Sequence, residues 1–428
     1  MDRPVNVLIY PSGSENALEV KDALSYKLNI TIWGASSRKD HSIYVYQNYF
    51  EAPNVNEESF LEQFNLLLTK HKIDFIIPTH DTVSLKLSEL KNELKAILIS
   101  SDYETNRVCR YKKETYKLFT KYDFCPKVYD DINLVDNWPI FIKPNIGEGG
   151  KNSFIAENLK EFECIKTLLK QDSLILEYLP GKEFTVDCFT DKNGNLRYIG
   201  ARERNRIWGG ISVNSRTVSN QRIFDIAKII NHKLKFRGYW YFQVKEDNDG
   251  NLKLLEISTR PAGTMALYRQ RGINFMLLSI YDFIGYEYKI LDNGYNVELD
   301  RSLFAKYNFD YEYDSIYLDF DDTLVFNNKI NRFCLLLLYQ CKEKGIPVIL
   351  LTRHKDDIYN TLERYDISKS LFEKIIVLKD NDKKVGFIKH HKPLFIDNAF
   401  SERLQVYEEL KIPVLDTDNI TLLLDWKS

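Results

Sequence analysis

The sequence has little of what marks disordered, disulfide-rich or membrane-spanning chains. Only 18 glycines and 12 prolines occur among 428 residues, which argues against disorder. The six cysteines include no Cys-x-x-Cys pair, so we expect neither a disulfide framework nor a thiolate zinc site, and a reducing compartment fits best. No apolar run approaches the roughly 18 residues that a membrane span requires. We therefore expect a cytoplasmic globular protein without a membrane segment.

Charge of one sign is also not in excess. The 59 Lys and Arg residues balance 61 Asp and Glu residues, for a formal net charge of -2, so no overall field attracts nucleic acid. What the chain does have is length and apolar surface: 44% of its residues are hydrophobic, including 27 tyrosines and 25 phenylalanines. At roughly 100–200 residues per domain, it should contain two to four packed α/β domains.

The first 100 residues have the pattern of βαβ units. An apolar strand at residues 5–10 is followed by a helical stretch and by a second strand at residues 30–33, and a later strand ends at His80 and Asp81. Because parallel sheets bind ligands at the carboxyl ends of their strands, residues 12–15 and the pair His80 and Asp81 are candidate site residues. The alternative is that they cap the helices that follow.

The middle of the chain changes character at about residue 102. A basic helix is expected over residues 107–122, and a strand follows that contains Lys143 and leads into a glycine-rich loop at residues 147–151. Such a loop could enclose phosphates with its backbone N–H groups. Strands and hairpins dominate residues 173–258, and the polar, tyrosine-rich residues 301–313 are interpreted as a linker.

A hairpin with a two-residue turn at Asp249-Gly250 would place Gln243 opposite Glu256. Ser258 would share their face, so that three oxygen-bearing side chains suited to Mg²⁺ converge. A polar, solvated sheet face is the competing interpretation.

A similar turn at Asn193-Gly194 would pair Glu183 with Arg204, with Asp187 and Arg202 on the same face. This pair could be a surface salt bridge that contributes little stability.

The order of these features, a lysine and a glycine loop before two acidic hairpins, resembles the ATP-grasp superfamily of carboxylate-amine ligases over residues 5–300. The family signature Glu-x-Asn-x-Arg reads Glu-Ile-Ser-Thr-Arg here, with Ser258 in place of Asn. The resemblance implies ATP and Mg²⁺, with phosphate contacts from Lys112, Lys143 and a lid containing Gly149 and Gly150, an adenine hinge at Glu177, Tyr178 and Leu179, ribose contacts from Glu183, metal ligands Gln243, Glu256 and Ser258, and acyl phosphate contacts from Arg204 and Arg260. By position in the sequence, Arg202 and Arg206 compete for the last role.

The C-terminal part begins a new regular α/β pattern. Its strands are expected at residues 316–318, 348–351, 375–378 and 394–396, and its helices at residues 332–344, 355–365 and 383–390. The first strand leads into Asp319-Phe-Asp-Asp-Thr-Leu324, and three later points match in order, namely Thr352, Lys384 and Asp397. Over residues 314–428 this series resembles haloacid dehalogenase-like (HAD-like) phosphatases.

That second resemblance implies a Mg²⁺-dependent route through an aspartyl phosphate. Asp319 would be the nucleophile and Asp321 the general acid and base. Thr352 and Lys384 would bind the phosphoryl group, with Lys383 as the rival, and the metal would lie at Asp319, Asp321 and Asp397, with a backbone carbonyl among its ligands. The stretches between the motifs are too short for a cap domain, and Asn398 stands where an acidic residue is common in the family.

We therefore expect an α/β protein with a pre-ATP-grasp domain at residues 1–100, an ATP-grasp α+β domain at residues 101–300 whose lid covers about 137–178, and a capless Rossmann-like HAD domain at residues 314–428. The hypothesis is a bifunctional enzyme that joins a small carboxylate to an amine and hydrolyses a small phosphorylated metabolite. The alternatives are a ligase with a non-catalytic HAD-like scaffold, and an ATP-binding sensor without turnover. A homodimer is one expectation, because dimers are common among similar proteins.

Overall fold

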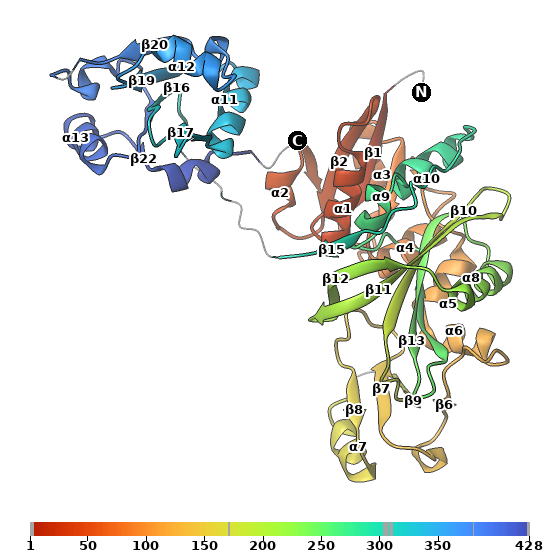
Figure 1. Ribbon diagram of the computed structural model, residues 1–428. Coiled ribbons are helices and arrows are strands. Elements are labelled where there is room, and N and C mark those ends of the chain that lie inside the picture. The colour runs from red at the N-terminus through yellow and green to blue at the C-terminus, as the bar shows by residue number, and fades with distance from the viewer. Residues whose placement is uncertain (1–3, 170–171, 303–306, 308–310, 380, 426–428) are drawn as a thin grey trace. The chain divides into compact units, whose positions relative to one another are not determined.

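The computed structural model describes residues 4–169, 172–302, 307, 311–379 and 381–425. It divides into two compact units, Met1–Ser302 and Leu303–Ser428, which are described separately (Figure 1). Within the described ranges, no helix is both long enough and apolar enough to cross a bilayer. The expected linker at residues 301–313 lies partly outside the described residues.

The first unit opens with a parallel five-stranded sheet in the order β3-β2-β1-β4-β5. Ser14 and His80 cap the helices that follow β1 and β4, because their side chains accept hydrogen bonds from the N–H groups of Ala17 and Thr82. The βαβ pattern is thus confirmed, and the capping interpretation is confirmed for Ser14 and His80 only; both of these residues, with Glu15, also line a cavity in the first unit. The strands are β1 (Val5–Tyr10), β2 (Ile30–Ser36), β3 (Asn48–Glu51), β4 (Phe75–Pro78) and β5 (Ile97–Leu98), and the helices are α1 (Glu15–Leu24), α2 (Ser42–Val45), α3 (Phe60–Lys70) and α4 (Asp81–Glu89).

The basic helix expected over residues 107–122 is in fact two helices, α5 (Tyr103–Arg110) and α6 (Lys112–Phe119). The break lies at Tyr111, whose backbone is extended, and it places Lys112 at the start of α6. A four-stranded antiparallel sheet then forms a separate lobe at the lower end of Figure 1, in the order β6-β9-β7-β8 with α7 (Leu159–Lys166). Its strands are β6 (Val128–Tyr129), β7 (Ile140–Pro144), β8 (Phe154–Ala156) and β9 (Ser173–Glu177).

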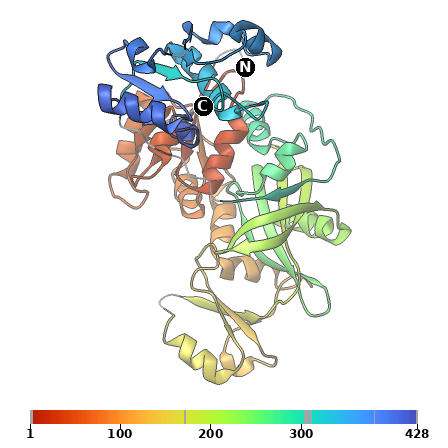
Figure 2. The same ribbon diagram turned by 60° about the vertical axis from the view of Figure 1, so that its left-hand side comes forward.

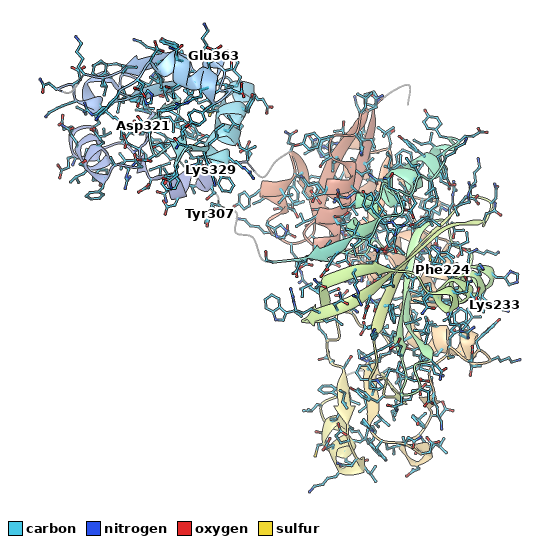
Figure 3. All side chains as sticks on the ribbon, viewed as in Figure 1. Phe224, Lys233, Tyr307, Asp321, Lys329 and Glu363 are labelled. Atoms are coloured by element: carbon cyan, nitrogen blue, oxygen red, sulfur yellow. The ribbon has the colours of Figure 1, made fainter. Side chains whose placement is uncertain are left out.

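A six-stranded sheet in the order β14-β13-β10-β11-β12-β15 completes the first unit (Figure 2). Helix α8 (Gln221–Lys233), with Phe224 and Lys233 labelled in Figure 3, covers it through Ile223, Ile226 and Ile230, which share a core with Trp240. The strands are β10 (Glu183–Thr190), β11 (Leu196–Trp208), β12 (Ile211–Val218), β13 (Gly238–Glu246), β14 (Leu252–Ser258) and β15 (Glu298–Asp300), and the remaining helices are α9 (Ala266–Gln270) and α10 (Phe275–Ile284).

Both predicted two-residue turns are wrong, although the pairings derived from them at the site are right. The turns are three-residue loops with glycine in the left-handed region. They are closed by hydrogen bonds from the N–H of Asp191 to Asn195 O, at 3.0 Å, and from the N–H of Asp247 to Asn251 O, at 2.9 Å. The longer loops shift the register by one residue, and a bulge farther along each hairpin shifts it back. Gln243 therefore still lies opposite Glu256.

The second unit is built on a parallel sheet in the order β20-β19-β16-β21-β22. The expected helix at residues 383–390 is replaced by a short 3₁₀ turn, η3 (Lys384–Phe387), because Gly386 is a poor helix former and Lys384 points into the domain. A small hairpin, β17 (Val325–Phe326) and β18 (Lys329–Ile330), follows the first strand. The other elements are β16 (Ser315–Leu318), α11 (Arg332–Lys344), β19 (Val348–Thr352), α12 (Ile358–Arg364), β20 (Lys374–Val377), β21 (Pro393–Ile396), α13 (Phe400–Leu410) and β22 (Val414–Leu415).

Candidate active sites

A cavity of about 670 Å³ lies in the first unit, lined by residues from its parallel sheet, the lobe with the β6-β9-β7-β8 sheet, and its six-stranded sheet. Its size is that of a typical small-molecule site. All but one of the residues predicted from the ATP-grasp resemblance line it. These are Lys112, Lys143, Gly149, Gly150, Glu177, Tyr178, Leu179, Glu183, Arg204, Gln243, Glu256 and Arg260. The exception is Ser258.

Two lysines supply positive charge to this cavity. Lys143, on β7, donates hydrogen bonds to Tyr116 Oη at 2.6 Å and to the carbonyl of Leu255 at 2.9 Å, and Lys112 donates to Gly147 O at 3.1 Å. Among the described residues, neither lysine forms an ion pair. Burial, together with the nearby charge of Lys112, lowers the pKa of Lys143 to about 7. An anion bound here would restore the charge of Lys143.

The bulge in β14 explains how the Leu255 carbonyl reaches the site. The register shifts between Gln243 and Val244, which leaves Leu255 unpaired in the ladder. Its carbonyl instead accepts hydrogen bonds from Lys143 and from the hydroxyl of Tyr116, the latter at 2.7 Å. Bulges commonly redirect groups beside functional sites. Tyr116, which lines the cavity, was not among the predicted site residues, because nothing in its sequence context distinguishes it from a core aromatic.

The pair Gln243 and Glu256 fits one divalent ion. The two residues are directly opposed on β13 and β14, line the cavity, and present one amide and one carboxylate group. Among the described residues, no cluster of three or more His, Cys, Asp or Glu side chains could hold a metal by itself. Mg²⁺ at this pair would therefore take most of its ligands from phosphate and water, as it commonly does.

Ser258 lies outside the lining of the cavity and is engaged elsewhere. Its hydroxyl donates to Asp81 Oδ1 at 2.6 Å, and Ser258 itself is buried. The serine side chain is shorter than the asparagine of the family signature, and here its hydroxyl forms a hydrogen bond with the carboxylate of Asp81. We therefore leave Ser258 out of the metal site.

The arginines that competed for the acyl phosphate role have different surroundings. Arg204 forms an ion pair with Glu183, as the hairpin register predicts, and also donates to Gly210 O at 2.9 Å. Arg202 is fully buried and holds Asp187 through two hydrogen bonds of 2.7 and 3.1 Å, while it also lines the cavity. Arg206 is exposed and pairs with an aspartate at the sheet edge. The structure thus separates Arg206 from the cavity but leaves Arg202 in it.

The glycine-rich loop is held from two sides. Gly149 and Gly150 have positive φ angles of 60° and 67°, which suits glycine. On one side, His80 Nε2 lies 3.0 Å from Glu148 Oε2, and this hydrogen bond lowers the pKa of Glu148. On the other side, the turn between β11 and β12 approaches so closely that a Cβ atom at Gly210 would collide with the carbonyl of Gly149. The loop therefore bridges the edge of the parallel sheet and the β11–β12 turn.

The second unit gathers a separate polar cluster at the carboxyl edge of its sheet. Asp319 follows β16 and Asp397 follows β21, and the Nζ atom of Lys384 lies between them, 2.6 Å from Asp319 Oδ1 and 2.5 Å from Asp397 Oδ2. Burial raises the pKa of Asp319 to about 6, with Lys384 opposing the shift and Asp397 adding to it. Lys383, the rival for the phosphate role, is exposed and pairs with Glu409 on α13.

The side chains around this cluster differ in exposure. Thr352, which ends β19, is fully buried, and Thr323 donates to both Asp319 and Asn398, at 3.4 and 3.3 Å. Asp321, labelled in Figure 3, is exposed and lies 2.9 Å from Nδ1 of His354. His354 was not predicted, since a lone histidine after a strand carries no signal in a single sequence. The two buried carboxylates have one ammonium group between them, so that one negative charge has no counter-charge in the cluster when both are ionised.

Comparison with known proteins places part of the first unit in a described family. Residues 170–301 match a family described as ATP-grasp in the biosynthetic pathway with Ter operon. A search of curated protein sequences found no match. The first unit therefore contains an ATP-grasp domain.

Solved structures agree on this fold at low sequence identity. Biotin carboxylase from Campylobacter jejuni is 15% identical with a TM-score of 0.58, over 68% of this chain and 74% of its own. L-amino acid ligase from Bacillus licheniformis is 14% identical with a TM-score of 0.52, over 65% of this chain and 74% of its own. Pyruvate carboxylase from Rhizobium etli is 15% identical with a TM-score of 0.56 over 67% of this chain, which spans only 29% of that longer protein.

Proposed function

We propose that the first unit is an ATP-dependent carboxylate-amine ligase. The observation that carries the proposal is that one cavity gathers the two lysines, the glycine-rich loop, the hinge at residues 177–179 and the facing pair Gln243 and Glu256. The fold is shared with L-amino acid ligase from Bacillus licheniformis, which supports the proposal.

The chemistry would proceed by activating the acid. A carboxylate is a poor electrophile, and its attack on the γ-phosphorus of ATP gives an acyl phosphate and ADP, after which the amine displaces phosphate. The lysines and Arg260 would neutralise the transferring phosphoryl group, and the glycine-rich loop would exclude water from it. Gln243 and Glu256 would hold Mg²⁺, which would supply further charge neutralisation at the phosphates.

A panel of acids and amines tests this proposal. Purified protein with Mg²⁺ and ATP should release ADP only when a productive acid and amine are both present. Lys112→Met should reduce that turnover by about a hundredfold or more, as loss of a phosphate-neutralising group does. Lys113→Met is the matched control, because the neighbouring Lys113 is exposed and pairs with Asp172 instead. Nucleotide binding without turnover across a broad panel would favour the sensor alternative.

A second candidate function belongs to the second unit, which we propose to be a phosphatase. The supporting observation is that Asp319, Lys384 and Asp397 are in contact at the carboxyl edge of a parallel sheet. Asp319 would attack phosphorus to form an aspartyl phosphate, and the leaving alkoxide would take a proton from Asp321 and depart as the alcohol. Asp321 would then accept a proton from the water that hydrolyses the aspartyl phosphate. Mg²⁺ at Asp319 and Asp397 would neutralise the phosphate during both steps.

Hydrolysis of an aryl phosphate tests the phosphatase. Asp319→Asn should abolish it and leave ADP release by the first unit unchanged, because the amide is no longer a nucleophile. Asp322→Asn is the control, since this neighbouring aspartate is exposed and has no role in the proposed steps. Equal hydrolysis by Asp319→Asn and wild type would refute the nucleophile assignment. Absence of hydrolysis in the wild type would favour a scaffold role for this unit.

A further inference from the structure

The segment His80-Asp81 has a role in the site that helix capping does not require. His80 caps α4, whereas Asp81 begins the helix and its side chain turns toward the six-stranded sheet. There Asp81 Oδ2 accepts from Nε of Arg260 at 2.9 Å and Oδ1 accepts from the hydroxyl of Ser258 at 2.6 Å. Both carboxylate oxygens are thus engaged by β14 and the residues just after it.

The guanidinium of Arg260 is held on several sides. Besides Asp81, it contacts the carbonyl of Pro261 through Nη1 at 3.0 Å, and its Cζ atom lies 5.3 Å from the centre of the Tyr241 ring. Within the described part of the chain, Nη2 has no protein acceptor at hydrogen-bond distance, and the residue lines the cavity. Arg260 is therefore held by Asp81 and by Pro261 O while its side chain lines the cavity.

The charges around Asp81 agree with this arrangement. Burial alone would raise the pKa of Asp81, but Arg260, Ser258 and the nearby charge of Arg110 together hold it well below its usual range. The carboxylate is therefore ionised at all ordinary pH values and forms a persistent charged pair with Arg260. A charge-assisted hydrogen bond of this kind is roughly twice as strong as one between neutral groups, and Ser258 holds the other oxygen of the same carboxylate.

We propose that Asp81 is a positioning residue that holds Arg260 against the transferring phosphoryl group, and that Ser258 supports Asp81 in this task. The inference rests on the proposed ligase function of the first unit. Serine at position 258, where the family signature has asparagine, then has a physical role. Its short side chain lies away from the metal site and holds the carboxylate of Asp81, and that carboxylate holds Arg260.

The test compares the affinities of AMP-PNP and ADP, each with Mg²⁺, measured by calorimetry on the full chain. The ratio isolates what the protein gains from the γ-phosphoryl group. Asp81→Ala should reduce the wild-type preference for AMP-PNP about tenfold and leave ADP affinity within about twofold, because a misplaced arginine loses a charge-assisted contact. Asp81→Asn keeps the shape of the side chain, and its preference for AMP-PNP should lie between those of the wild type and Asp81→Ala. The double variant with Arg260→Ala should lose no more than Arg260→Ala alone, since Asp81 acts through Arg260.

Glu19→Ala is the matched control for stability. Glu19 and Arg269 form a similar partly buried pair, with contacts of 2.8 and 3.0 Å, between α1 and α9, but neither lines the cavity. If Asp81→Ala and Asp81→Asn keep the same AMP-PNP preference as Glu19→Ala, Asp81 is merely structural and the proposal is overturned. If the wild type binds neither nucleotide, the proposed ligase function is refuted, and with it the role of Asp81 and Arg260 in that function.

Discussion

The pKa of Lys143 leads to a prediction about how nucleotide affinity depends on pH. With a pKa of about 7, this lysine is half charged at pH 7 in the free protein. A bound triphosphate favours the charged form, so binding above pH 7 requires uptake of a proton. Raising the pH should therefore weaken binding, whereas an ordinary lysine with a pKa near 10.4 would give no change below pH 9.

The magnitude follows from proton linkage. If only the charged lysine binds, the dissociation constant of Mg²⁺-ATP should rise about 50-fold between pH 7 and pH 9, equivalent to about 2 kcal/mol. Proton uptake on binding should be about 0.5 at pH 7 and about 0.9 at pH 8. The phosphates do not interfere, because their last pKa of about 6 lies below this range.

Calorimetry in buffers with different ionisation enthalpies measures both quantities. The control is Lys143→Arg, which keeps the charge but cannot lose it in this range, and it should bind with a flat pH profile. A wild-type affinity that is constant from pH 7 to pH 9, or binding without proton uptake, would refute the assignment of Lys143 as a buried lysine that regains its charge on nucleotide binding.

Three further predictions concern the loop and the second unit. His80→Gln should weaken Mg²⁺-ATP binding about three- to tenfold and increase proteolytic cleavage in the loop, since the contact with Glu148 is lost; unchanged cleavage would show that the contact does not hold the loop. Gly210→Ala should reduce ligase turnover more than tenfold with little change in melting temperature, because a Cβ would push away the carbonyl of Gly149; turnover equal to wild type would contradict this. Millimolar Mg²⁺ at pH 7.5 should raise the melting temperature of the second unit, since the ion relieves repulsion between buried carboxylates, and Asp397→Asn should lose most of that gain; an equal gain in both proteins would place the ion elsewhere.

Local patterns predicted the individual elements and much of the candidate site. Strand alternation and turn residues predicted Gln243 opposite Glu256. That pairing is correct although the predicted turn is wrong, because a bulge reverses the one-residue register shift that the longer loop causes. The helix at residues 332–344 was predicted with its observed bounds. The prediction of a helix over residues 383–390 is wrong, because Lys384 points inward to contact Asp319, and sequence periodicity carries no information about such a tertiary contact.

The order of the α/β elements, the hairpin pairings and the residue types of both candidate sites follow from local patterns, because these features depend on neighbours along the chain. Which polar groups become partners depends instead on how the chain packs in three dimensions. This packing separates Lys384 from Lys383, joins Ser258 and Arg260 to Asp81 across more than 170 residues, and brings His80 to Glu148. Such contacts depend on how sheets and loops from distant segments pack, and the chemistry of a buried charge depends on what surrounds it in space.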